Sequence, residues 1–138
     1  MLRVLSRLCV LCVLCVLGCR DRQKPPPPDD AVVWHQVGSW SGRGNRQTET
    51  FTSDTGGFRV RWATKNETAP GAGTLKVIFR SGDSGREIID AVDARGVGSD
   101  TAIVSAERPR WYYLTIDSAN VEWTVSVDER IEGHRVSR

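Results

Sequence analysis

Val121-Glu122-Trp123-Thr124-Val125-Ser126-Val127-Asp128 alternates apolar and polar residues without a break, and its four apolar side chains share one face of an extended chain. Side chains along a β-strand point alternately to its two sides, so this pattern predicts a strand with one buried and one exposed face. Such strands are typical of antiparallel sheets that pack one face on a core. The C-terminal part of the chain therefore indicates a β-rich domain.

The same alternation recurs upstream, most clearly in residues 58–62 and 75–80. Turn-forming Gly, Asp, Asn and Ser residues separate the segments, and no window carries a convincing helical period. Seven or eight short strands at roughly 8–12-residue spacing predict an all-β fold, a single antiparallel β-sandwich. The remaining strands are expected at 32–40, 47–52, 87–92, 101–105 and 111–116.

The apolar positions of these segments predict one hydrophobic core. A domain of about 100 residues can fold on a single core without disulfides. The side chains expected to point inward are Trp40, Phe51, Phe58, Val60, Trp62, Leu75, Val77, Phe79, Leu114, Ile116, Trp123, Val125 and Val127.

The first twenty residues have a different character. Arg3 and Arg7 precede an apolar run from Leu8 to Leu17, which ends at Gly18-Cys19 and turns polar at Arg20. A basic start, a short apolar run and a small residue before a cleavage site are typical of a secretory signal peptide. The run is too short to span a bilayer as a helix, which needs ~20 apolar residues.

The end of this run, Val16-Leu17-Gly18-Cys19, resembles the lipobox of bacterial lipoproteins. The resemblance implies a diacylglycerol on the Cys19 thiol and cleavage between Gly18 and Cys19. It also implies a fatty acyl group such as palmitate on the new N-terminus. More than one acyl chain gives stable anchoring where a single chain is marginal.

All four cysteines lie between Cys9 and Cys19, with the spacing C-x2-C-x2-C-x3-C. Bacterial ferredoxins use this spacing to ligate iron–sulfur clusters. Here the residues between the cysteines are only Val, Leu and Gly, and the segment precedes the folded domain. We therefore interpret the first three cysteines as small apolar residues of the signal peptide.

Four parts are expected along the chain: a signal peptide (1–18), a lipidated Cys with a Pro-rich linker (19–30), a β-sandwich domain (31–130) and a flexible tail (131–138). Four consecutive prolines in the linker favour a polyproline II spacer, which can hold the domain roughly 30 Å from the bilayer. The lipobox resemblance implies export through the inner membrane. By resemblance to the sorting pattern of two-membrane bacteria, Arg20 after the Cys favours delivery to the outer membrane, at its periplasmic or surface face.

Charge and composition argue against several functions. The chain has 19 Lys and Arg against 17 Asp and Glu, and the signal peptide removes two of these cations, Arg3 and Arg7. A formally neutral mature chain does not predict a nucleic-acid partner. Neither His35 nor His134 belongs to a metal-ligand spacing, and the domain has no Cys. We expect no metal and no cofactor.

Aromatic residues give the best argument for binding. Trp111-Tyr112-Tyr113 must place rings on both faces of a strand. The candidate ligand-binding residues are Trp34, Trp111 and Tyr113, because an exposed ring can stack on a sugar or anchor a protein partner. In the alternative, Tyr112 is core and the other rings only cover sheet surfaces.

Acidic residues offer weaker candidates. Oxygen-rich loops can bind calcium, and an unrecognised acidic site is one way in which this domain would be an enzyme. Solvated carboxylates and ion pairs are the competing interpretation. Asp54-Thr55-Gly56 matches the string used by aspartic proteases, but its polar neighbours predict an exposed turn. The acidic cluster consists of Asp83, Asp90, Asp93 and Asp100.

The last two strands, residues 111–116 and 120–125, resemble the ending of small uncharacterised β-sandwich domains in bacterial secreted proteins and lipoproteins, and of CUB-like sandwiches. CUB domains usually carry disulfides, which this domain lacks. The resemblance implies a fold and no activity. The sequence as a whole predicts a lipid-anchored envelope protein, not an enzyme, that displays a binding or structural domain. Its expected partners are the membrane and an envelope protein or polysaccharide; a carbohydrate-binding module and an acidic enzyme stay open as alternatives.

Overall fold

The computed structural model describes residues 32–106 and 110–131, and this part of the chain contains strands and no helix. The predicted all-β fold is therefore confirmed. No helix long and apolar enough to cross a membrane occurs within these two ranges. The strands are β1 (Val33–Arg43), β2 (Arg46–Gln47), β3 (Phe51–Ser53), β4 (Gly57–Lys65), β5 (Thr74–Ser81), β6 (Glu87–Arg95), β7 (Gly98–Ser105), β8 (Arg110–Ala119) and β9 (Glu122–Ile131).

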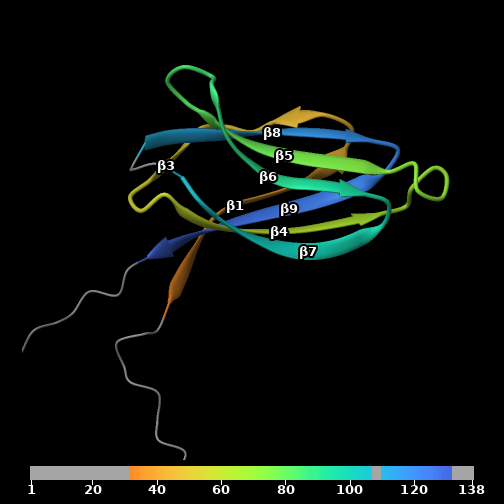
Figure 1. Ribbon diagram of the computed structural model, residues 1–138, viewed down its shortest axis with the longest axis horizontal. Helices are drawn as coiled ribbons and strands as arrows, with labels where there is room; N and C mark the ends of the chain where they lie inside the picture. The colour runs from red at the N-terminus through yellow and green to blue at the C-terminus, as the bar shows by residue number, and fades with distance from the viewer. Residues whose placement is uncertain (1–31, 107–109, 132–138) are drawn as a thin grey trace, which may run out of the picture.

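Two antiparallel sheets pack face to face (Figure 1). We call the sheet with the order β1-β9-β4-β7 sheet A. Sheet B has the order β2-β8-β5-β6, with β3 also paired to β8. This arrangement is the predicted single antiparallel β-sandwich.

The start of β1 and the end of β9 lie side by side, because Val33 is opposite Ile131 in the strand pairing (Figure 1). We call this end of the sandwich, which also holds the β3–β4 turn, the proximal end. The β6–β7 turn at Gly96–Val97 lies at the other end, which we call the distal end. The described chain therefore enters and leaves the domain at one end.

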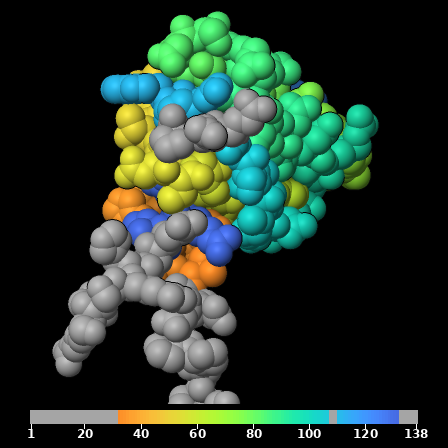
Figure 2. Space-filling model, turned by 60° about the vertical axis from the view of Figure 1, so that its left-hand side comes forward, coloured from red at the N-terminus to blue at the C-terminus, as the bar shows by residue number. Residues whose placement is uncertain are grey.

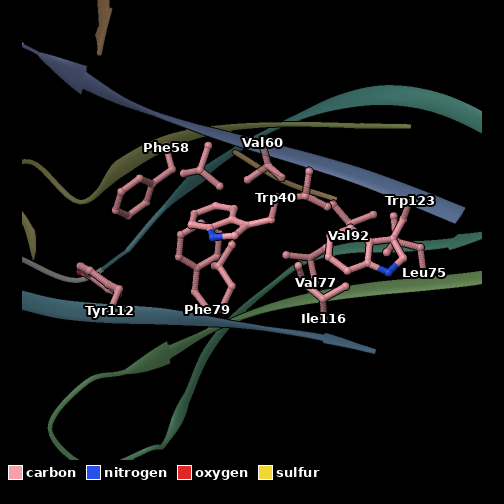
Figure 3. Packing of buried hydrophobic residues seen from close by; sticks show 13 residues of the cluster. Trp40, Phe58, Val60, Leu75, Val77, Phe79, Val92, Tyr112, Ile116 and Trp123 are labelled. Carbon is pink, nitrogen blue, oxygen red and sulfur yellow. The ribbon is translucent and has the colours of Figure 1, made fainter. Parts of the chain in front are cut away.

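The core lies between the two sheets, and side chains of β4, β5, β8 and β9 point toward one another across it (Figure 3). Eleven of the thirteen predicted core residues are buried, while Phe51 and Trp62 are partly buried and pack against the others. Tyr112 is fully buried, as the structural alternative for the Trp-Tyr-Tyr stretch predicts. Its ring joins Phe51, Phe58 and Phe79 in an aromatic group, with neighbouring centroids 4.9–6.3 Å apart.

The strand predicted at 47–52 is interrupted, which corrects that expectation. Thr48 turns inward between β2 and β3, and its hydroxyl accepts a hydrogen bond from the backbone N–H of Leu114 at 3.0 Å. The N–H of Thr48 donates to the carbonyl of Leu114, also at 3.0 Å. One extra residue is accommodated opposite β8 here, as in a β-bulge, so the edge of sheet B bends and its strand is divided in two.

A second irregularity lies in β1, where the pairing with β9 skips Val37. Before the bulge, Trp34 is opposite Arg130; after it, Trp40 is opposite Val125. Directly opposed residues point to the same side of a sheet. The bulge therefore puts Trp34 on the outer face of sheet A and Trp40 in the core, although both positions have even numbers.

Candidate functional site

The three predicted ligand-binding aromatics do not form one platform. Trp111 is 53% exposed on the outer face of β8, and Tyr113 lies partly buried on the same face. Trp34 lies on the opposite outer face, that of sheet A, where the guanidinium of Arg59 is 4.8 Å from the centroid of its ring. A cation over an aromatic face is attracted to it, so one side of Trp34 is already occupied.

A cleft of about 650 Å³ opens at the proximal end, between the start of β1, the end of β9, β3 and the start of β8. Figure 2 shows this part of the surface, with β1 in orange and β9 in blue beside β3 in yellow. Phe51 and Trp111 give the cleft an aromatic lining, and threonines and an amide add hydrogen-bonding groups. The lining residues are His35, Gln36, Val37, Thr50, Phe51, Thr52, Asp54, Trp111, Glu129 and Ile131.

Glu129 fastens the β3–β4 turn to β9 at one side of the cleft. One oxygen of its carboxylate accepts hydrogen bonds from the Ser53 hydroxyl at 2.6 Å and from the backbone N–H groups of Asp54 and Thr55 at 2.7 and 3.1 Å. The Thr55 hydroxyl in turn donates to the carbonyl of Arg130 at 2.7 Å. The turn at Asp54-Thr55 is exposed, as predicted, but Glu129 holds it in place.

These hydrogen bonds determine the charge state of Glu129. Partial burial by itself raises the pKa of this carboxyl, but the donors on Ser53, Thr55 and Asp54 together outweigh burial and leave the pKa lowered. A general acid needs a raised pKa so that it keeps its proton near neutral pH. Glu129 is therefore an ionised structural group beside Asp54, the second carboxylate that lines the cleft.

A second acidic residue is buried on the outer face of sheet A. Asp128 is only 3% exposed, although the alternation of β9 predicts a solvent-facing position. Arg59 binds it from its Nε and Nη2 atoms at 2.9 and 2.8 Å, and Arg61 approaches at 3.1 Å. The two guanidinium groups shield the carboxylate from water and balance its negative charge.

The acidic cluster predicted from the sequence is spread over the molecule. Asp83 lies in the β5–β6 loop, and Asp90 on β6 forms an ion pair with Lys76 at 3.6 Å. Asp93 is also on β6, opposite Lys76 in the strand pairing. Asp100 lies on β7, in the other sheet. Within 32–106 and 110–131, no group of three or more His, Cys, Asp or Glu residues is placed to hold a metal ion.

The sequence features with the most specific chemistry, Gly18 and Cys19, lie outside the described residues, as do the signal peptide, the linker and nearly all of the predicted tail. The chain matches no protein-family model and no curated protein. The resemblance of its last hairpin to CUB-like sandwiches stays a prediction.

Proposed function

We propose that this chain is a lipid-anchored cell-envelope protein, attached through Cys19, that displays a non-catalytic β-sandwich with a binding or structural role. The observation that carries the proposal is the segment Val16-Leu17-Gly18-Cys19 after a basic start and a short apolar run. The position of Val33 beside Ile131 supports it, because a tether that enters at the proximal end leaves the distal end of the sandwich accessible.

The anchored chain would work at the surface of a membrane, the outer membrane in a two-membrane bacterium. Its partners would be the membrane itself and an envelope protein or polysaccharide. A nucleic-acid partner is not proposed, because removal of Arg3 and Arg7 with the signal peptide leaves 17 of the 19 cations to face 17 anions.

Cys19→Ser in the full-length chain tests the anchoring, with Cys15→Ser as the matched control in the same apolar segment. Cells that express each variant are fed an alkyne-bearing palmitate, and the protein is examined for label, for size and for its distribution between membrane and soluble fractions. We expect the wild type and Cys15→Ser to be labelled and processed. Cys19→Ser should lose the label and keep the unprocessed size; a labelled, processed Cys19→Ser chain would contradict the proposal.

A second candidate function is saccharide binding in the proximal cleft. The observation that favours it is the half-exposed ring of Trp111 beside Thr50, Thr52 and Gln36, because sugars combine an apolar face that stacks on aromatics with hydroxyls that need polar partners. Trp111→Ala should abolish co-sedimentation of the mature protein with insoluble envelope polysaccharide. Ile103→Ala, which removes another exposed apolar side chain on the edge strand β7, should leave it unchanged. Equal binding by both variants would exclude a role of Trp111.

A further inference from the structure

Apolar side chains are exposed where the described chain enters and leaves the domain. Val33 and Ile131 are opposite each other at the ends of β1 and β9, with exposed fractions of 47% and 41%. Val32, the residue before β1, is also exposed. Exposed apolar residues that adjoin one another indicate a surface that is covered when the protein is in place.

The next pair along the same two strands is Trp34 and Arg130, on the outer face of sheet A. Arg59 stacks on Trp34, and Arg61 lies beyond it on the same strand. The anion on this part of the face, Asp128, is buried beneath Arg59 and Arg61. We call the surface formed by Val33, Trp34, Arg130 and Ile131 the proximal corner.

Among the residues that the structure describes, the carboxylates closest to this corner do not cancel the charge on its outer side. Glu129 alternates with Asp128 and Arg130 along β9 and so points to the inner side, where it binds the β3–β4 turn. Asp54 lies in that turn and lines the cleft. The outer side of the corner therefore carries a tryptophan and arginines. Val33 and Ile131, at the ends of the same two strands, point to the inner side, as Glu129 does.

This combination suits the boundary between lipid and water. Transfer of aliphatic groups out of water lowers the free energy. Tryptophan prefers the level of the lipid headgroups. Arginine binds lipid phosphates while its aliphatic stem covers apolar surface. Each cation close to an anionic membrane surface contributes about 1 kcal/mol of attraction. Two observations favour a lipid bilayer as the partner of the proximal corner. The arginines are complementary in charge to lipid phosphates, and the chain enters the domain at this corner.

The tether brings the proximal corner close to lipid. The linker predicted at 19–30 connects Cys19 almost directly to β1, so the corner is the part of the domain nearest the anchor along the chain. At ~3.1 Å per residue the linker sets an upper limit of roughly 40 Å on the separation, and it does not prevent the domain from resting on the surface.

We propose that the proximal corner docks onto the bilayer that carries the lipid anchor, with Val33 and Ile131 at the acyl-chain boundary and Arg130 at the lipid phosphates. The inference rests on the proposed lipidation and adds to it an orientation. The sandwich lies with its proximal end on the membrane and presents its distal end away from it.

A fluorescent label at a single introduced cysteine tests the docking, because the mature chain has no Cys other than Cys19. Ile131→Cys places the label in the corner. Val97→Cys is the matched control, an exposed apolar residue (58%) at the distal end. The lipidated full-length protein, purified from membranes, is reconstituted into vesicles of phosphatidylethanolamine and phosphatidylglycerol, and the label is quenched either by aqueous iodide or by lipids brominated in their acyl chains.

We expect iodide to quench the label at residue 131 at least about threefold less than the label at residue 97, and brominated lipids to quench only the former. Arg130→Glu in the Ile131→Cys chain, or vesicles of phosphatidylcholine, should restore part of the iodide quenching. Equal quenching at both positions in a chain whose mass shows lipid on Cys19 would overturn the docking alone. A chain without lipid on Cys19 would overturn the proposed function and the docking together.

Discussion

The carboxylate of Glu129 determines the geometry of the proximal cleft. It binds three consecutive residues of the β3–β4 turn, Ser53, Asp54 and Thr55, and so places the wall that faces Trp111. Its partners are 74–76 residues away in the chain. No local pattern identifies such a pairing; alternation predicts only that Glu129 follows the inward-facing Val127 on the same side of β9.

Glu129→Gln should lower the free energy of unfolding at pH 7 by about 1–3 kcal/mol, because hydrogen bonds to a charged group are lost. The native pKa of Glu129 is lowered, so its contribution is present above the ordinary glutamate value near 4.5 and is lost as the pH falls through the native value. Urea unfolding followed by tryptophan fluorescence should therefore show a difference in the free energy of unfolding between wild type and variant, and this difference should become smaller on acidification. Glu87→Gln, at an exposed ion pair, is the control and should change stability little. A gap that is independent of pH would contradict this role of Glu129.

Asp128 is the second residue whose role depends on tertiary contacts. Asp128→Ala would leave Arg59 and Arg61, which lie on the same face of β4, without the carboxylate that they share. We expect a loss of about 2–3 kcal/mol, below the 3–5 kcal/mol typical of fully buried pairs because both guanidinium groups reach water. Glu122→Ala, which removes exposed ion pairs with Arg43 and Lys65 and an exposed hydrogen bond from Asn66, should lower the free energy of unfolding by less than about 1 kcal/mol. Similar denaturant midpoints for the two variants would show that Asp128 is not a structural counter-ion.

At the scale of elements, strand pairing reveals what the sequence could and could not predict. Alternation placed the inward residues of β4, β5 and β9, because these strands run regularly along the core. It could not relate Trp34 to Trp40, since the bulge at Val37 exists only when β1 pairs with β9. The candidate site shows the same limit. The sequence identifies Trp111 as a candidate, but the lining of the cleft comes from β1, β3, β8, β9, the β2–β3 connection and the β3–β4 turn, and only the fold brings these segments together.

The β3–β4 turn itself supports a prediction. Gly56 has a φ of +70°, and a Cβ there would lie 2.7 Å from the carbonyl oxygen of Ala106. Gly44 has a φ of +84° and open space around it. Gly44→Ala should therefore lower the free energy of unfolding by about 1–2 kcal/mol, the strain of an alanine in the left-handed conformation. Gly56→Ala should lower it clearly more, because the backbone at Ala106 must also move. Thermal unfolding of the two variants compares the costs, and equal melting temperatures would mean that the turn shifts freely.

For the whole molecule, the first and last strands determine where a tether would meet the domain. Pairing of β1 with β9 places the first and last strands side by side at one edge of sheet A and directs the described chain in and out at the proximal end. A lipid on Cys19 would then fix that end near the membrane and leave the rest of the sandwich free. The proposed location and orientation of the domain both depend on this attachment.

Mass spectrometry of the chain purified from membranes tests the attachment most directly. We expect an intact mass equal to residues 19–138 plus a diacylglyceryl group, with or without a further acyl chain, and a tryptic Cys19-Arg20 peptide that carries the whole addition. A chain that retains residues 1–18, begins at another residue, or carries an unmodified Cys19 would contradict it.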